Sequence, residues 1–247
     1  METLKVVYIN EIFKISKKKK FIMALAFSLF SVIAAAIAVY YLNNFAGIRI
    51  TSSSDFSIMV LSVLSYTLFP LFIAFIGIDM FAGEFVDQTI KLTLICPAPR
   101  FKVFLGKVLA IASFIMANLM FVMILSFVVS IFISTSMPNL LKILLAYIME
   151  FFPLFVFALV VVLISNIAKG TSSAFMFIIF IFLVFNGLGL IFPYFKSLLF
   201  TSTFDWYNLF LGSYINLSKI LRTFLILLGY SIMLFAAGYY LFEKKDI

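Results

Sequence analysis

Few side chains in this sequence have the chemistry to bind or react, and five of them lie close together between two apolar segments. They follow one another in the order Asp79, Glu84, Asp87, Lys91 and Arg100. Acids and bases of this kind form ion pairs and charge-assisted hydrogen bonds. Residues 78–107 are therefore the candidate surface for binding another polypeptide.

Most catalytic chemistry lacks its usual residues in this chain. There is no histidine, which removes the commonest general base and metal ligand. The single cysteine, Cys96, excludes an internal disulfide and a cysteine metal cluster. No phosphate-binding loop is present, because Gly106-Lys107 lacks the upstream glycine and the following hydroxyl residue. We predict no catalytic site, no metal site and no cofactor in the chain itself, and an intramembrane enzyme is the least favoured class.

The composition places these charges in a membrane protein. The chain has 247 residues, of which 65% are hydrophobic and 11% charged, whereas soluble domains are about half apolar and about a quarter charged. Six segments reach the length of about 20 residues that a helical span needs. They cover residues 21–42, 56–78, 104–133, 141–165, 172–193 and 220–242. We predict an all-α membrane protein with six transmembrane helices in a single domain, residues 1–247.

The positive charges predict the orientation in the membrane. With the N-terminus inside, thirteen of the 18 lysines and arginines fall on the cytoplasmic side. We therefore expect a multi-pass protein of the cell membrane with both termini in the cytoplasm. The net charge of +8 does not indicate nucleic-acid binding, because the cations flank spans. A cleaved signal peptide ending at Ala36-Ile37-Ala38 is disfavoured, because the apolar run continues past that site.

Residues 3–19 predict an amphipathic helix before the first span. Apolar side chains recur there at helical spacing, at Leu4, Tyr8, Ile12 and Ile15. Lysines lie off this stripe, and a basic amphipathic helix lies in the membrane interface. The helix is either a simple anchor or an elbow helix that braces the bundle.

Residues 84–94 predict a second short amphipathic helix, in the loop after the second span. Asp87 and Lys91 form an acid-then-base pair at i,i+4. An apolar stripe repeats every fourth residue, at Val86, Ile90 and Leu94. Pro97 ends the helix, because proline has no amide hydrogen and restricts the residue before it.

The order of residues in this loop resembles the signature region of ABC-2 type permeases, the membrane subunits of ATP-binding-cassette exporters. The matching residues are Asp79, Glu84, Thr89, Ile90, Leu92, Leu94, Pro97, Arg100 and Lys107. Gln88 stands where glycine is common in that family, and Pro99 stands where a small polar residue is common. The motif covers about 30 residues, and the six-span pattern extends the likeness over the chain.

The resemblance implies that the loop is a coupling helix, which docks on a separate ATPase subunit. The residues that it assigns to coupling are Asp79, Glu84, Asp87, Thr89, Lys91, Pro97 and Arg100. ATP and magnesium are then bound by the partner, and the assembly is expected to hold two ATPase subunits and two permeases. The second permease is either an identical copy or a close paralogue.

Two polar residues inside the apolar segments are candidates for a translocation path. Glu150 lies within the fourth span, where a charged residue costs about 2.5–3.5 kcal/mol on insertion scales. It lines a substrate path, pairs with a cation such as Lys142, or is a packing residue near the outer boundary. Asn186 lies in the fifth span where glycines predict close packing. Pro153 is expected to kink the fourth helix.

The segment 194–219 is too polar to form a full span and is rich in aromatic residues. It resembles the short re-entrant extracellular helices of ABC-2 permeases, and an ordinary aromatic belt is the alternative. The function expected from the resemblance is export of a hydrophobic or amphiphilic substrate, such as a peptide, an antibiotic or a lipid-like molecule. Peptide export linked to antimicrobial resistance is the favoured case. The alternative is a partner-independent channel or secondary transporter with Glu150 as the coupling acid.

Overall fold

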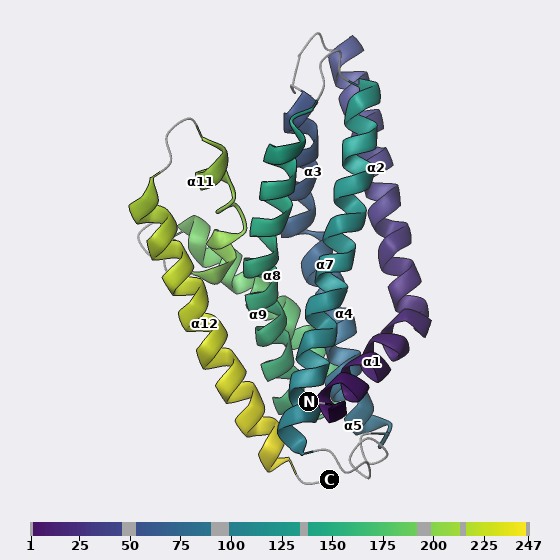
Figure 1. Cartoon of the computed structure of the whole chain (residues 1–247), viewed down its shortest axis with the longest axis vertical. Helices are drawn as coiled ribbons and strands as arrows, with labels where there is room; N and C mark the ends of the chain where they lie inside the picture. The colour runs from purple at the N-terminus through teal and green to yellow at the C-terminus, as the bar shows by residue number, and fades with distance from the viewer. Residues whose placement is uncertain are drawn as a thin grey trace.

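The fold is seen in a computed structural model, which describes residues 2–45, 53–89, 99–133, 138–191, 199–212 and 216–245. All regular elements in these ranges are helical (Figure 1). In chain order they are α1 (Glu2–Lys17), α2 (Lys19–Phe45), α3 (Ser53–Tyr66), α4 (Leu68–Ile78), η1 (Asp79–Gly83), α5 (Glu84–Val86), α7 (Arg100–Ile133), α8 (Leu140–Ile167), α9 (Thr171–Ile191), η2 (Phe200–Thr203), α11 (Asn208–Leu211) and α12 (Leu217–Lys244). Within the described ranges, 6 helices are long and apolar enough to cross a membrane, which confirms the predicted all-α, six-span fold.

The second span is the one whose structure differs most from a simple helix. Pro70 has no amide hydrogen, and its ring clashes with the carbonyl four residues earlier, which belongs to Tyr66. Helix α3 accordingly ends at Tyr66, and α4 begins at Leu68. Helical structure also continues past residue 78, because η1 is a π-helical turn that leads directly into α5. Figure 1 shows α3, α4 and α5 following one another along the long axis of the molecule.

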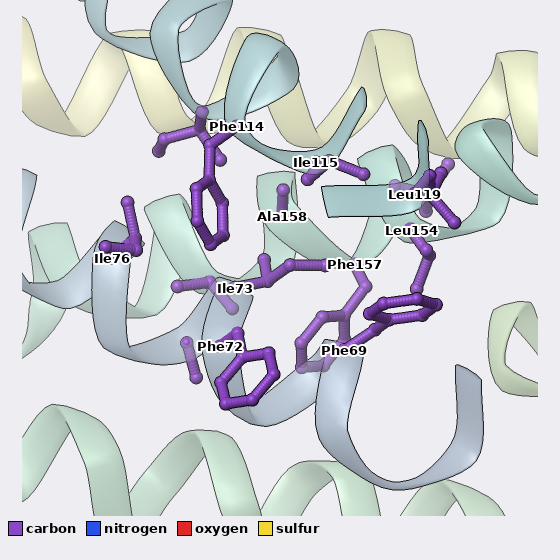
Figure 2. Packing of buried hydrophobic residues seen from close by; sticks show 14 of the residues in the cluster. Phe69, Phe72, Ile73, Ile76, Phe114, Ile115, Leu119, Leu154, Phe157 and Ala158 are labelled. Carbon is purple, nitrogen blue, oxygen red and sulfur yellow. The ribbon is translucent and has the colours of Figure 1, made fainter. Parts of the chain in front are cut away.

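Helices α7 and α8 form the centre of the bundle. They pack against each other and against α3 and α4, while α2 lies on α7 and α12 lies on α8. Figure 2 shows side chains from three of these helices meeting, with Phe69 and Ile73 of α4 between residues such as Phe114 of α7 and Phe157 of α8. Lipid tails are as apolar as these side chains, so close packing rather than exclusion of water holds the helices together.

Close approach of α4 and α8 depends on a glycine. A Cβ atom added to Gly77 would lie 2.6 Å from Cγ1 of Val161 on α8. Any larger residue at this position therefore requires Val161 or its helix to shift. Gly77 lies two residues before Asp79, where the π-helical turn begins.

The outer helices α2, α9 and α12 expose apolar side chains over most of their length. On α12, for example, Ile232 and Met233 are 68% and 71% exposed. Such faces suit contact with lipid or with another apolar helix. Figure 1 shows both chain termini and α5 at one end of the bundle, whereas α11 lies toward the other end. Helix α1 covers most of the predicted amphipathic range of residues 3–19, but it ends at Lys17, and Lys19 already belongs to α2. The elbow role of α1 stays a prediction, as does re-entry of the segment that holds η2 and α11.

Candidate functional site

A buried lysine lies at the centre of the candidate site. Lys107 of α7 has no exposed side-chain surface, and its Nζ donates to Oε2 of Glu84 at 2.6 Å. It also donates to Oε2 of Glu11 at 3.2 Å and to the carbonyl oxygen of Met80 at 3.1 Å. An ammonium group has three hydrogens. Each hydrogen of Lys107 therefore has an acceptor, which is the condition for keeping a lysine charged inside a protein.

A second lysine closes the network into a ring. Nζ of Lys14 donates to Oε1 of Glu11 at 2.8 Å and to Oε1 of Glu84 at 3.3 Å. Each of the two acids thus contacts both lysines, Lys14 and Lys107, and the four charges cancel. We call these four residues, Glu11, Lys14, Glu84 and Lys107, the ion ring. It joins α1, α5 and α7, which are far apart in the sequence.

The ion ring changes the proton affinity of its members in α1. Burial alone disfavours the charged form of Glu11, but Lys107 and Lys14 outweigh it and hold the pKa of Glu11 below its usual value of 4.5. Burial likewise disfavours the charged form of Lys14, but Glu11 and Glu84 outweigh it and raise the pKa of Lys14 above 10.5. Both groups are therefore charged around neutral pH, and their attraction adds to the stability of the fold.

Helix α1 reaches the ion ring because it lies directly on α7. Gly106 makes this possible, since a Cβ atom there would lie 2.7 Å from Cγ1 of Val7. The hydroxyl oxygens of Tyr8 and Ser113 are 2.6 Å apart, and Lys102 donates to the Thr3 hydroxyl at 2.8 Å. Polar contacts on both sides of Gly106 thus fix α1 along the first turns of α7.

The π-helical turn η1 places the acids of the second span. π-Helical turns within α-helices are rare and often lie at functional sites. This one supplies the Met80 carbonyl to Lys107, and Glu84 follows directly after it. Asp79 begins the turn and contacts two other lysines, with Nζ of Lys20 at 2.6 Å and Nζ of Lys18 at 3.6 Å.

An aromatic cluster lies next to the ion ring. Phe81 of η1, Phe104 of α7 and Phe242 of α12 pack against one another, with ring centroids 5.6 to 6.0 Å apart. Phe85 of α5 adds an edge contact to Phe242. Nζ of Lys107 lies 5.9 Å from the centre of the Phe81 ring. The rings exclude water from the ammonium group, which strengthens its attraction to the two acids.

The structure divides the predicted coupling residues into two groups. Glu84 is buried in the ion ring, whereas Asp87 and Thr89 are exposed. Arg100, also exposed, donates to the backbone carbonyl of Glu243 at the end of α12. Lys91 and Pro97 lie outside the described residues.

The predicted continuous helix over residues 84–94 needs correction. Helix α5 ends at Val86, and Asp87–Thr89 form a turn. Gln88 has a φ of 54°, a left-handed conformation that a continuing α-helix excludes and that often ends helices. The rest of the predicted helix lies outside the described residues. Val86, Asp87, Gln88 and Thr89 are all exposed, and we call them the exposed turn.

Sequence reasoning missed three of the four ion-ring residues as partners of Glu84. One signal was available, because Lys107 lies inside an apolar run where an unpaired charge is costly. Glu11 and Lys14 carried a weaker signal, the i,i+3 spacing of an acid and a base. No local pattern indicates that Glu11 contacts Lys107, which lies 96 positions later.

The second candidate region, around Glu150, is also buried. Glu150 is 0% exposed, and among the described residues neither of its carboxyl oxygens has a hydrogen-bond partner. The buried hydroxyl of Ser65 interacts with the Glu150 carboxyl, although no hydrogen bond of normal geometry joins the two groups. Lys142 is exposed and forms no ion pair with Glu150 in the described part of the chain, so that interpretation is wrong.

Sequence reasoning missed a second acid in this region. Asp205, in the turn after η2, accepts hydrogen bonds from Tyr66 at 2.9 Å, Ser62 at 3.2 Å and Tyr207 at 3.4 Å. It also interacts electrostatically with Glu150. Burial raises the pKa of the Tyr207 hydroxyl, and the charges of Asp205 and Glu150 raise it further, although Ser62 opposes the shift.

Pro153 and Trp206 connect this region to the outer segment. Pro153 lies within α8 and leaves the Met149 carbonyl without its usual amide donor. The indole Nε1 of Trp206 donates to that carbonyl at 2.7 Å. Asn186, the other predicted path residue, donates to the Phe182 carbonyl of its own helix at 2.9 Å.

Comparison with known proteins assigns the family. A family model described as "ABC-2 family transporter protein" matches residues 5–247, which is nearly the whole chain. Comparison with curated proteins gave no match. The match agrees with the six apolar helices and with the acidic and basic residues between the second and third spans. The family is a membrane component of transport and is not itself catalytic, so an ABC ATPase is its implied partner. The chain belongs to the ABC-2 transporter family and is a multi-pass permease of an ABC transporter.

Proposed function

We propose that this permease exports a hydrophobic or amphiphilic substrate from the cytoplasm, driven by ATP hydrolysis in two copies of a separate ATPase subunit. ATP and magnesium are bound by that partner, and this chain needs no cofactor of its own. Residues 1–247 act as a single permease domain in the cell membrane with both termini in the cytoplasm. A second permease, identical or closely related, completes the transport unit.

The observation that carries this proposal is the position of the ion ring behind the exposed turn. Glu84 is only two residues before the first exposed residue of that turn, Val86. The ATPase docks on the exposed turn, where Asp87 and Thr89 are accessible, together with Lys91, Pro97 and the exposed Arg100. Glu84 and Asp79 lie behind this surface, at the end of the second span, and connect it to the bundle.

The ion ring transmits displacement of the turn to two other elements. Lys107 connects Glu84 to α7, and Glu11 with Lys14 connects it to α1. Removing one partner of a buried ion pair costs about 3–5 kcal/mol, because it leaves a charge without a partner. Pulling Glu84 away from Lys107 is costly for the same reason. The end of the second span, the start of α7 and α1 therefore move as one body when the ATPase subunits close.

The interior of the bundle supports the proposed substrate class. Residues that line the centre are mostly phenylalanine, isoleucine, leucine and valine, and a path between two such permeases is apolar. Glu150 and Asn186 are the polar residues that we assign to this path. An amphiphilic peptide, an antibiotic or a lipid-like molecule fits these surfaces better than an ion or a sugar. Peptide export with a role in antimicrobial resistance is the favoured case.

The docking step is tested by co-purification. Asp87→Lys reverses an exposed charge on the turn, and we expect it to lower the amount of ATPase that co-purifies with the permease. Lys142→Glu, which reverses an exposed charge at the start of α8, is the control and should keep wild-type association. Equal association in both variants contradicts docking on the exposed turn.

A second candidate function rests on Glu150. A buried acid without a hydrogen-bond partner is the expected feature of a proton- or cation-coupled carrier. This alternative predicts flux across vesicles that contain the purified permease alone. Export that requires the ATPase and ATP supports the proposed function, whereas gradient-driven flux without the ATPase supports the carrier.

A further inference from the structure

We propose that the phosphate of an anionic phospholipid binds in a basic pocket where α1, α2 and the end of the second span meet. The pocket has a volume of about 350 Å³ and is open on one side. Its lining residues are Lys18, Lys19, Lys20, Asp79, Gly83 and Asp87. This inference does not require the proposed transport cycle, because it concerns binding between the permease and its bilayer, and Asp87 is the residue that the pocket shares with the exposed turn.

The position of the pocket suits a lipid headgroup. Lys18 is the single residue between α1 and α2, and Lys19 begins the first span. Asp79 and Gly83 come from the end of the second span, and Asp87 directly follows it. The start of one span and the end of the next lie at the same membrane surface, so the pocket lies where the lipid phosphates are.

The exposed face of α1 gives an independent indication of this depth. Val6, Ile9 and Phe13 follow one another at i, i+3 and i+7, and their side chains are 66%, 53% and 56% exposed. An apolar helix face of this kind lies in the boundary between headgroups and acyl chains. Helix α1 leads directly into Lys18, so the pocket is at the same boundary.

The charges of the pocket favour an anion. Three lysines face two carboxylates, which leaves a net charge of +1. Asp79 accepts from Lys20 at 2.6 Å and lies 3.6 Å from Lys18, so it holds both ammonium groups in place. An ammonium group has three hydrogens, of which Lys20 uses one in its hydrogen bond to Asp79, and the remaining hydrogens of both lysines are available to phosphate oxygens. Lysines next to a membrane attract anionic lipids in this way.

An apolar surface adjoins the basic residues. Phe75 of α4 is 40% exposed, and Nζ of Lys20 lies 5.8 Å from the centre of its ring. Phe75 also stacks on Phe175 of α9 with ring centroids 4.8 Å apart. A phospholipid has a charged phosphate next to hydrocarbon chains, which matches the basic pocket next to the exposed Phe75 ring. Free phosphate has no hydrocarbon to contact that ring. The lipid is therefore the favoured source of the phosphate.

Binding in this pocket connects the lipid to the candidate site. Asp79 begins the π-helical turn that leads to Glu84, and Asp87 belongs to the exposed turn. A phosphate held by Lys18, Lys19 and Lys20 fixes the corner between α1 and α2 against this segment. We therefore expect an anionic lipid to stabilise the purified permease.

The test measures lipid binding to the full-length permease, delipidated in detergent, by native mass spectrometry. Phosphatidylglycerol, phosphatidylethanolamine and phosphatidylcholine are added separately, and thermal unfolding is followed in parallel. The binding variant is Lys18→Gln with Lys19→Gln, which leaves Lys20 and the lysines of α1 to maintain orientation. The control is Lys142→Gln with Lys219→Gln, which removes the same charge from exposed positions distant from the pocket.

We expect one phosphatidylglycerol to bind more tightly than either other lipid and to raise the unfolding temperature. The binding variant should lose about tenfold in affinity, since each lysine near an anionic lipid contributes several-fold. The control should bind as the wild type does. Equal binding by both variants, or phosphatidylethanolamine or phosphatidylcholine binding as well as phosphatidylglycerol, overturns the proposal. If inorganic phosphate displaces phosphatidylglycerol from the permease, the pocket recognises free phosphate, and the assignment to lipid is overturned.

Discussion

Lys107 of α7 and Glu84 of α5 form an ion pair of 2.6 Å with no exposed lysine surface, at the point where the second span leaves the bundle. The pair does not present Glu84 to a docking partner. It instead attaches the end of the second span to the third, and Glu11 and Lys14 extend the attachment to the N-terminal helix. In the function proposed above, the ATPase contacts the exposed turn, and the ion ring is the buried connection behind it.

The first prediction concerns the balance of charges in the ion ring. Lys107→Met leaves two buried acids with one lysine, and we expect it to lower the free energy of unfolding by about 3–5 kcal/mol. Lys107→Met combined with Glu84→Leu removes a whole ion pair and leaves Glu11 paired with Lys14. The double variant should therefore recover most of the stability, as measured by thermal unfolding in nanodiscs. A double variant less stable than Lys107→Met contradicts the pairing.

The second prediction concerns pH. The pKa of Glu11 is lower in the folded protein than its usual value of 4.5, so its charge adds stability above pH 4.5. That stability is lost as the pH falls through the lower, folded-state pKa. Wild-type protein should therefore unfold at a higher temperature than Glu11→Gln at neutral pH, and the difference should shrink in acid below pH 4.5. A difference that does not depend on pH shows that the Glu11 charge is not the cause.

The fold was largely predictable, because long apolar segments must be helical to satisfy their backbone groups in a membrane. The break before Leu68 had a visible cause in Pro70, yet hydropathy alone joined both halves into one span. The site was only partly predictable. The position of Glu84 and the exposure of Asp87 follow from the loop between two spans, but the contact of Glu11 with Lys107 depends on how α1 lies over Gly106.

Two further features had no signal in the sequence. The left-handed conformation of Gln88 replaces the expected helix with a turn, although glutamine has no preference for that conformation. The hydrogen bonds from Ser62, Tyr66 and Tyr207 to Asp205 join residues up to 143 positions apart, which no periodicity reveals. Side chains far apart in sequence become partners through helix packing, so contact information was needed to find them.

The third prediction concerns the hydrogen bond that lies beside Pro153 in α8. Trp206→Phe keeps an aromatic ring against Phe152 but removes the donor to the Met149 carbonyl, so it should cost about 1–3 kcal/mol of stability. Pro153→Ala restores the amide that this carbonyl lacks. Trp206→Phe should therefore cost less in the Pro153→Ala background, and a double-mutant cycle on thermal unfolding measures the difference. If Trp206→Phe costs the same stability in both backgrounds, the Trp206 indole does not replace the amide that is missing at Pro153.

The fourth prediction concerns Glu150. Neither of its buried oxygens contacts a cation in the described structure, so a neutral side chain of the same shape should fit. We expect Glu150→Gln to unfold within a few degrees of the wild type and Glu150→Lys, which buries an unpaired cation, to fold poorly. The yield of monodisperse protein and its unfolding temperature distinguish the variants. If Glu150→Gln fails to fold, the claim that the surroundings of Glu150 accept an uncharged side chain is wrong.

The most direct test of the coupling role of the ion ring is the number of substrate molecules exported per ATP hydrolysed, in vesicles that contain the permease and its ATPase. The variant is Lys107→Met with Glu84→Leu, which leaves the exposed turn unchanged. We predict that the ATPase still co-purifies with this variant and still hydrolyses ATP. The number of substrate molecules exported per ATP should fall by about tenfold, a factor within the range that coupling between two sites usually spans. Wild-type export per ATP in this variant contradicts the claim that Lys107 and Glu84 connect the ATPase to the bundle.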